Sequence, residues 1–210
     1  MIIRLPEPTD RSIGYFSADR WKSHALRRPA AYRLTVLAPS PATVVRQVGG
    51  WLFDMRAAGW EVTVCVVDHA DPRPLEILGA IVIELEQFLG STFEEIRPYA
   101  VATAMDDYRD NPGIRDGVLR HLEQRNARVV LWGAREPTDL AGRLEAATHH
   151  LSVAGCAFKA CALTATGAFD ERVEATESFW VTDPDSWHRI GALRSSSNLV
   201  SCNDIQPSSE

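Results

Sequence analysis

Ligands suited to a divalent metal stand together just after the apolar segment 61–67. Asp68, His69 and Asp71 fall within four consecutive positions, and Asp139 belongs to a later polar stretch. Carboxylate and imidazole groups form mixed oxygen and nitrogen sites for several divalent metals. A simpler interpretation is that Asp68 and Asp71 end a strand and cap the following helix, while His69 is an exposed loop residue. We favour the simpler interpretation and keep the four residues as a fallback metal site.

A second group of carboxylates consists of Asp106, Asp107 and Asp110. Such a group could accept hydrogen bonds from sugar hydroxyls or hold Mg²⁺, a hard cation that prefers oxygen ligands. The alternative is a solvated turn in which Asp110 or Asn111 is a helix cap before Pro112. We favour the turn and keep Asp106 and Asp107 as candidates for ligand binding.

Two further groups invite a catalytic interpretation that their context does not favour. Ser40 follows an apolar segment, as a nucleophile elbow would, but its surroundings are Pro-Ser-Pro and not Gly-x-Ser-x-Gly. Pro41 has no N–H for an oxyanion hole, so Ser40 is interpreted as a helix N-cap. His149 and His150 are adjacent on an expected helix and would point about 100° apart. We therefore interpret them as surface or interface histidines.

Apolar patterns of two kinds alternate along the chain and indicate the elements that position these residues. Short β-branched runs predict strands at Arg33–Ala38, Glu61–Val67, Tyr99–Met105, Arg128–Trp132 and Val173–Val181. Helical spacing predicts helices at Ala18–Leu26, from Pro41 to near Gly59, and at Pro74–Leu89, Ile114–Arg125 and Asp139–His150. A polar loop is expected over Asp106–Gly113, and Ala154–Leu163 fits either a helix or a strand.

This alternation predicts an α/β fold, a three-layer αβα Rossmann-like sandwich with a mostly parallel sheet. In such sheets ligands bind beyond the carboxyl ends of the strands. The rule selects the loops Pro39–Thr43, Asp68–Arg73, Asp106–Asp110 and Gly133–Asp139.

The expected division of the chain has three parts. Residues 1–31 form an N-terminal extension, 32–194 the α/β domain, and 195–210 a polar, flexible tail. The turn after the first strand contains neither Gly-x-Gly-x-x-Gly nor Gly-x-x-x-x-Gly-Lys, the glycine-rich motifs that bind phosphate groups. Gly49-Gly50 lies too deep in its helix to hold a phosphate at the helix start.

The segment Pro39–Val64 has a specific spacing. Pro39-Ser40-Pro41 is followed by seven residues, Gly49-Gly50, eight residues, Gly59 and then Trp60-Glu61-Val62-Thr63-Val64. This resembles the opening of the LmbE-like (PIG-L) family of zinc-dependent N-acetylglucosaminyl de-N-acetylases. That family has Pro-His-Pro-Asp-Asp-Glu on a strand–turn–helix, then a Gly-Gly pair and a Gly-His-x-Val-x-Val strand.

Weaker matches follow in the family's order, so that the resemblance covers roughly residues 33–182. They are Arg73-x-x-Glu76-x-x-x-Ala80, the strand Arg128–Gly133 before the family's His-x-Asp-His motif, Phe158–Leu163 and Glu177-Ser178-Phe179. The resemblance implies that Arg73 binds a hydroxyl or phosphate of a substrate. A surface pair between Arg73 and Glu76, at i and i+3, is the alternative.

The resemblance fails at the residues that carry the family's chemistry. Ser40, Ala42, Thr43 and Val44 stand where the family has its metal-binding His, its two Asp and its Glu. The family's remaining histidine ligand falls near Asp139. Amide hydrolysis on zinc needs three protein ligands, an open position for water and a base. Ala42 has no acid–base group, and hydroxyls are poor zinc ligands, so the resemblance implies the fold without its zinc chemistry.

Composition excludes several classes of function. The chain has 210 residues and a formal charge of −6, with no long basic run, which disfavours nucleic-acid binding. No apolar run reaches the roughly 18–20 residues of a membrane span, and the start of the chain has no signal-peptide core. The four cysteines form no C-x-x-C pair. We therefore expect a cytoplasmic protein with free thiols and with Cys65 in the core.

Three functional hypotheses follow. The first is a catalytically degenerate LmbE-like protein, without a cofactor, that binds a small sugar-like or acidic metabolite or a protein partner in the cleft. The second is a Rossmann-like structural or interaction protein that forms a homo-oligomer, with Ala154–Leu163 as the candidate contact. The third is a zinc-dependent amidohydrolase built on the fallback metal site. The candidate cleft residues are Ser40, Thr43, Asp68, His69, Arg73, Asp106, Asp107, Arg135 and Asp139.

Overall fold

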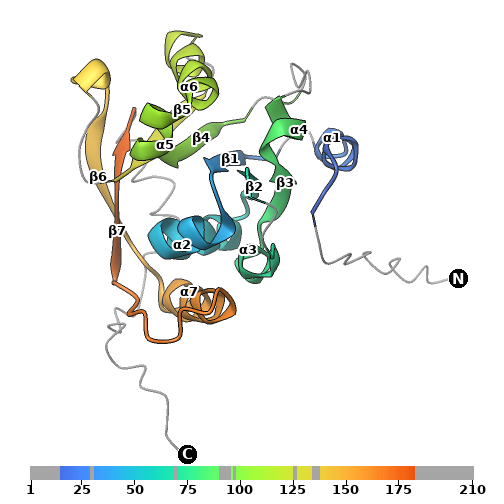
Figure 1. Cartoon of the computed structure of the whole chain (residues 1–210), viewed down its shortest axis with the longest axis vertical. Coiled ribbons are helices and arrows are strands. Elements are labelled where there is room, and N and C mark those ends of the chain that lie inside the picture. Colours follow the sequence, from blue (N-terminus) through green and yellow to red (C-terminus); the bar gives the residue numbers. More distant parts are fainter. Residues whose placement is uncertain are drawn as a thin grey trace, which may run out of the picture.

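A computed structural model of the chain describes residues 15–28, 31–68, 71–89, 96, 98–124, 127–133 and 138–182. Its centre is a seven-stranded sheet in the order β3-β2-β1-β4-β5-β7-β6 (Figure 1). The strands are β1 Arg33–Ala38, β2 Glu61–Val66, β3 Ile81–Glu84, β4 Ala100–Ala104, β5 Arg128–Trp132, β6 Glu145–His150 and β7 Thr176–Val181. The first five are parallel, β7 is antiparallel to β5, and β6 is antiparallel to β7. The predicted α/β class with a mostly parallel sheet is confirmed.

The helix after β1 shows how local sequence sets the architecture. Ser40 is the N-cap of α2 (Pro41–Ala57), with its Oγ 3.4 Å from the N–H of Thr43, as predicted. A cap of this kind satisfies one of the free N–H groups at a helix start. The helix is kinked at Val48, where φ is −138° and ψ is 15°. It ends before Gly59, whose φ of +93° suits glycine.

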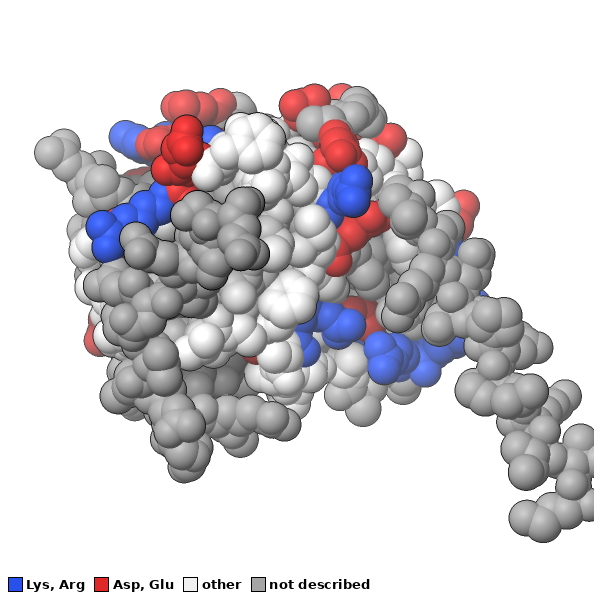
Figure 2. Space-filling model, turned by 90° about the horizontal axis from the view of Figure 1, so that it is seen from below, with Lys and Arg blue, Asp and Glu red and all other residues white. Residues whose placement is uncertain are grey.

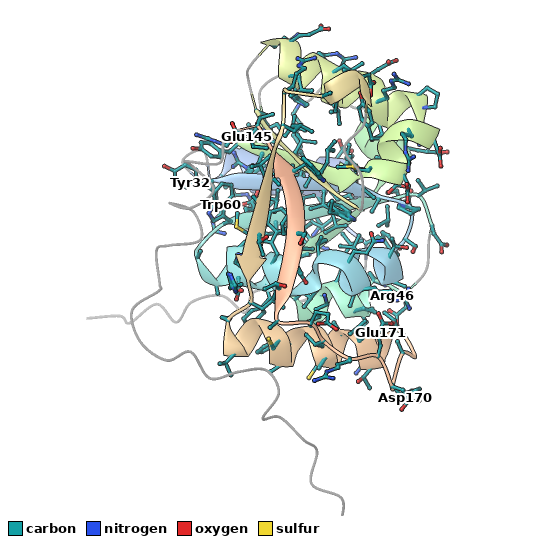
Figure 3. The ribbon with its side chains drawn as sticks, turned by 90° about the vertical axis from the view of Figure 1, so that its left-hand side faces the viewer. Tyr32, Arg46, Trp60, Glu145, Asp170 and Glu171 are labelled. Carbon is teal, nitrogen blue, oxygen red and sulfur yellow. The ribbon has the colours of Figure 1, made fainter. Side chains whose placement is uncertain are left out.

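One face of the sheet is covered by α2 and α3 (Arg73–Ile77), and α7 (Val153–Ala165) packs against both of these helices (Figure 1). The core here includes Trp51, Leu52, Leu75 and Phe179, all of which are buried. β6 and β7 run next to each other across the front of Figure 3, with Glu145 at the start of β6.

The opposite face is covered by helices from both halves of the chain. They are α1 (Ala18–Leu26), α4 (Leu85–Leu89), α5 (Met105–Asp110) and α6 (Pro112–Gln124). Trp21 of α1 is buried and donates from its indole to Thr63 Oγ1 of β2 at 2.9 Å. Phe16 forms a parallel bridge with Ile83, so residues just before α1 extend the sheet beyond β3. The two buried faces make the three layers of the sandwich.

The predicted helix Pro74–Leu89 is wrong. The structure has α3, then β3, then α4 in this segment. Gly79 has a φ of +79°, which ends the first helical turn. The apolar run Ile81-Val82-Ile83 fits a helical stripe as well as a strand, and pairing with β2 decides the outcome.

The predicted helix Asp139–His150 is also wrong. A short 3₁₀ turn, Thr138–Leu140, precedes a turn at Gly142 and then the strand β6. β6 pairs along its whole length with β7, which lies far along the chain and which local periodicity cannot reveal. The expected loop Asp106–Gly113 is mostly helical, in α5 and the start of α6, and Ala154–Leu163 is helical within α7.

Cysteine pairing corrects one further expectation. Cys65 is fully buried, as predicted, and both Cys65 and Cys161 are free. Cys156 is disulfide-bonded, so the expectation of free thiols is wrong for this residue.

Among the described residues, no helix is both long and apolar enough to span a membrane. The tail 195–210 and residues 1–14 of the extension lie outside the described residues, and the three-part division stays a prediction.

Candidate functional site

The carboxyl ends of four parallel strands meet at one edge of the sheet. Strands β2, β1, β4 and β5 are paired in register and end at Val66, Ala38, Ala104 and Trp132. Most of the candidate residues follow these ends, which is where α/β sheets bind ligands. His69 and Arg135 lie outside the described residues.

After β1, the polar side chains bond to one another. The hydroxyls of Ser40 and Thr43 are 3.0 Å apart and partly buried, and Ser40 also caps α2. One turn further along α2, Gln47 Oε1 accepts a hydrogen bond from the indole N–H of Trp132 at 2.5 Å. These contacts tie the start of α2 to the end of β5. Ala42, between the two hydroxyls, contributes no polar side chain.

After β5, Asp139 is held by two donors. Tyr108 Oη donates to Asp139 Oδ2 at 2.8 Å, and Arg115 Nη2 donates to the same oxygen at 2.7 Å. Desolvation raises the pKa of Asp139, but the hydrogen bonds from Tyr108 and its own backbone and the charge of Arg115 outweigh it, so that the pKa is lowered. Burial and the bond to Asp139 raise the pKa of Tyr108 to about 12. Asp139 is therefore ionised and engaged at neutral pH.

After β4, the neighbouring carboxylates differ in their surroundings. Asp106 is exposed and pairs with Arg109 one turn along α5. Asp107 Oδ2 is buried without a hydrogen-bond partner among the described residues. Burial, followed by the charges of Asp106 and Asp110, raises the pKa of Asp107 to about 6. Asp107 can thus accept or donate a hydrogen bond near neutral pH.

After β2, the polar residues serve the start of α3. Asp71 Oδ1 accepts a hydrogen bond from the backbone N–H of Arg73 at 2.9 Å. The backbone carbonyl of Asp68 accepts from Tyr15 Oη at 3.1 Å, which brings the segment before α1 to this edge. Asp71 therefore bonds the first N–H of α3, while the N-cap position itself is held by Pro72 and has no side-chain cap.

Two residues of the fallback metal site, Asp68 and Asp139, follow strands that are not neighbours in the sheet. β1 and β4 lie between β2 and β5. Strands are spaced by roughly 4.8 Å, so the ends that carry Asp68 and Asp139 are about 14 Å apart. His69 lies outside the described residues, so the fallback metal site stays a prediction. In the described part of the chain, no three His, Cys, Asp or Glu residues form a group that could hold a metal.

A buried ion pair lies away from this edge. The spacing of its residues in the sequence did not indicate a role for it. Lys159 Nζ of α7 is 2.6 Å from Glu177 Oε1 of β7, and both residues are buried. The same carboxylate accepts hydrogen bonds from the backbone N–H groups of Gly50 and Trp51, at 3.1 and 2.8 Å. The kink at Val48 lies just before these N–H groups, and Glu177 caps the second half of α2.

Glu177, Lys159 and the start of the second half of α2 form a buried joint, and a close contact there requires glycine at position 50. A Cβ atom on Gly50 would lie 1.9 Å from Leu151 Cδ2. The Gly-Gly, Lys and Glu matches to the LmbE-like family therefore meet in one structural cluster. The sequence resemblance contained them, but it gave no indication that they touch.

His149, interpreted from the sequence as a surface or interface histidine, is largely covered by other residues of the chain. Its Nε2 is 2.9 Å from Asp54 Oδ2 of α2, and the imidazole is only 12% exposed. Alternation along β6 turns His149 inwards and leaves His150 exposed. The same Asp54 oxygen accepts from the N–H of Ser152 at 2.9 Å, so this contact joins the β6–α7 connection to α2.

Comparison with known proteins gives the fold and no closer relation. No family model matches the sequence, and no curated protein matches it. Solved structures do match. A teicoplanin-pathway deacetylase in complex with teicoplanin has a TM-score of 0.54 at 15% identity, covering 71% of this chain and 97% of its own.

Two further structures agree. A pseudoaglycone deacetylase has a TM-score of 0.52 at 16% identity, with 71% and 96% of the two chains covered. A conserved protein from Thermus thermophilus has a TM-score of 0.51 at 16% identity, with 72% and 94% covered. The chain therefore has the α/β fold of the LmbE-like deacetylases. At these identities the likeness concerns the fold alone.

Proposed function

We propose that this chain is a non-hydrolytic protein of the LmbE-like deacetylase fold that binds a small, hydroxyl-rich metabolite at the carboxyl edge of its sheet. One observation carries the proposal. The positions that the sequence resemblance aligns with the metal-binding His and the two Asp hold Ser40, Ala42 and Thr43. The hydroxyls of Ser40 and Thr43 bond to each other, and Ser40 caps α2. This part of the edge is a hydrogen-bonded helix start and not a set of metal ligands.

The residues present do not fit the zinc ion of the family. Zinc sites use Cys, His and carboxylate ligands, and neither Ser40 nor Thr43 belongs to these types. The remaining carboxylate, Asp139, has one oxygen bonded to both Tyr108 and Arg115. The guanidinium next to it also opposes a cation at this position. No hydrolytic step through zinc is therefore assigned to this chain.

The groups that remain suit hydroxyl recognition. Ser40 and Thr43 offer hydroxyls, Asp139 has a second carboxylate oxygen, and Asp107 can either donate or accept near neutral pH. Sites built from a few convergent polar groups of this kind fix the orientation of small ligands. A deacetylase of the same fold has been solved in complex with teicoplanin, which supports an organic ligand here.

Metal content is the first test. The protein is purified without a chelator or a nickel column, and zinc and iron per chain are measured by plasma mass spectrometry before and after incubation with zinc. We expect far less than one metal per chain in both samples. A stoichiometric metal, with release of acetate from N-acetyl amino sugars that is lost in Asp139→Ala, would overturn the proposal.

Ligand binding is the second test. Ligand-observed NMR with glucosamine and N-acetylglucosamine as probes should show binding without turnover. Asp107→Asn should weaken this binding, because it removes a carboxylate whose buried oxygen has no partner among the described residues. Asp110→Asn, an exposed neighbour in the same acidic stretch, is the matched control and should bind like the wild type. Absence of binding to both probes, or equal effects of the two variants, would contradict the assignment.

A further inference from the structure

The two edges of the sheet are covered to different degrees. β3 is short, and Phe16 pairs alongside it: its N–H donates to the carbonyl of Val82 at 2.8 Å, next to its bridge with Ile83. β6 has six residues and, in the part of the chain that the structure describes, pairs only with β7. Figure 1 shows β6 at the left-hand margin of the sheet. An edge strand presents a row of N–H and C=O groups that can pair with another strand.

The hydrogen bonds to β7 identify the residues that present these groups. The N–H of Leu151 donates to the carbonyl of Ala175 at 3.0 Å, and β6 and β7 continue this register. In an antiparallel pair, residues alternate between bonding the neighbouring strand and pointing away from it. Counted back from Leu151, the outward backbone groups belong to Ala146, Thr148 and His150. All three residues are exposed.

This open edge lacks the features that usually prevent strands from pairing. Edge strands of natural proteins are protected by Lys, Pro or a bulge. The outward positions of β6 hold Ala146, Thr148 and His150, and β6 pairs with β7 without a bulge along its whole length. The chain has a formal charge of −6, so two copies meet most easily where no carboxylates face each other. We propose that β6 pairs in antiparallel orientation with β6 of a second copy, which joins the two sheets about a two-fold axis at Thr148.

The hydrogen-bond pattern determines the register. A residue whose backbone groups point outwards must lie opposite another such residue. With the axis at Thr148, this residue lies opposite Thr148 of the second copy, and Ala146 lies opposite His150. All three outward residues then exchange both of their backbone hydrogen bonds. An axis at Ala147 or at His149 would leave one outward residue without a partner in β6.

The side chains suit this pairing. On one face the two Thr148 residues lie side by side, and threonines opposite each other can share a hydrogen bond. The small Ala146 lies beside the larger His150 of the second copy. On the other face Glu145 lies opposite Leu151 of the second copy, so the carboxylate does not meet a like charge. Like charges directly opposite each other would destabilise a pair of strands.

Sedimentation of the full chain tests the contact. Analytical ultracentrifugation over a wide range of concentration should show a mass that rises from one chain to two. Thr148→Lys places two cations opposite each other at the axis, and should raise the dissociation constant roughly tenfold or more. Circular dichroism checks that the variant is folded.

The matched control is the same substitution on a rival surface. α7 lies at the bottom of Figure 1, and Figure 2, seen from below, shows a broad uncharged area bordered by acidic and basic groups. Val153 and Phe158 of α7 are 42% and 43% exposed. Thr164 is an exposed residue of the same helix. Thr164→Lys should therefore form dimers like the wild type.

A cysteine at the axis tests the register. The background is Cys161→Ser, which removes an exposed free thiol. Thr148→Cys should link two chains through a disulfide when oxidised glutathione is added. Opposite Cα atoms in a hydrogen-bonded pair are about 5.5 Å apart, and disulfides span roughly 4.4–6.8 Å. Ala146→Cys should not link, because its equivalent in the second copy lies four residues, roughly 13 Å, further along the strand.

Three results would overturn the proposal. The first is a single-chain mass at every concentration. The second is a dimer that Thr164→Lys disrupts and Thr148→Lys does not, which would place the contact on α7. The third is linking through residue 146 in preference to residue 148, which would show that the strands do not meet about an axis at Thr148.

Discussion

The buried pair of Lys159 and Glu177 provides the sharpest test of how this fold is held together. Glu177→Gln removes the negative charge but keeps a side chain of nearly the same shape. Lys159 then remains as a buried cation without its partner, and the carboxylate contacts to Gly50 and Trp51 are reduced to those of one amide oxygen. Removing one partner of a buried ion pair costs about 3–5 kcal/mol. Total stabilities are about 5–15 kcal/mol, so the variant should lose a large part of its stability.

Urea denaturation followed by tryptophan fluorescence measures this loss. Lys159→Met should cost less than Glu177→Gln, because Glu177 keeps both backbone donors. The double variant should cost less than the sum of the two, since residues in direct contact couple by about 0.5–3 kcal/mol.

The control is the pair of Arg46 and Glu171, which Figure 3 shows together at the surface. Its atoms are 2.8 Å apart, but the side chains are 51% and 31% exposed, and exposed pairs contribute about 0–1 kcal/mol. If Glu177→Gln costs no more than Glu171→Gln, the argument for a structural joint at Glu177 is refuted.

Four further variants test other parts of the structure. Gly50→Ala should destabilise the fold strongly, because its Cβ would overlap Leu151, whereas Gly117→Ala, with no atom within 4 Å, should stabilise α6 by about 0.5–1 kcal/mol; thermal denaturation compares them. Asp107→Asn should raise stability at pH 8, and the gain should fall as the pH drops from 6 towards 4, because the folded pKa of Asp107 is raised to about 6 and its ionised form destabilises the fold. Asp139→Asn should act in the opposite sense: the pKa of Asp139 is lowered, so its contribution is present above the unfolded pKa of about 4 and is lost as the pH falls through the folded value. Urea midpoints across pH test both; a gain for Asp107→Asn that is constant with pH, or a loss for Asp139→Asn that is largest in acid, would contradict the assignments.

The elements that could be predicted from the sequence are those fixed by local rules. β1, α2 and β2 follow from continuous apolar runs and from a serine cap with proline at the next position. β3 and β6 could not be predicted in this way, because non-local pairing determines them. Glu145 of β6 lies opposite Val181 of β7. The residues of β3 fit both a helical and a strand repeat, and pairing with β2 selects the strand.

The candidate site likewise has features that the sequence predicts and features that it does not. The rule that ligands bind at the carboxyl ends of strands was sufficient to place Ser40, Asp107 and Asp139 at one edge. Their partners come from different elements. Tyr108 of α5 and Arg115 of α6 meet Asp139 only after the chain has folded. No spacing in the sequence indicates that contact, which decides the protonation state and the availability of Asp139.

Under the proposed non-hydrolytic function, the structure gives a physical reason why this fold could be kept without a zinc site. The matches that lie inside the molecule, Gly50, Lys159 and Glu177, form a buried joint in which each group satisfies another. The residues that differ from the family motif lie at a helix start, where a serine is itself favourable, since an N-cap of this type contributes about 0.5–2 kcal/mol. Ser40 therefore stabilises α2 directly. The stability of the fold depends on this joint, and similarity of fold does not by itself imply similarity of chemistry.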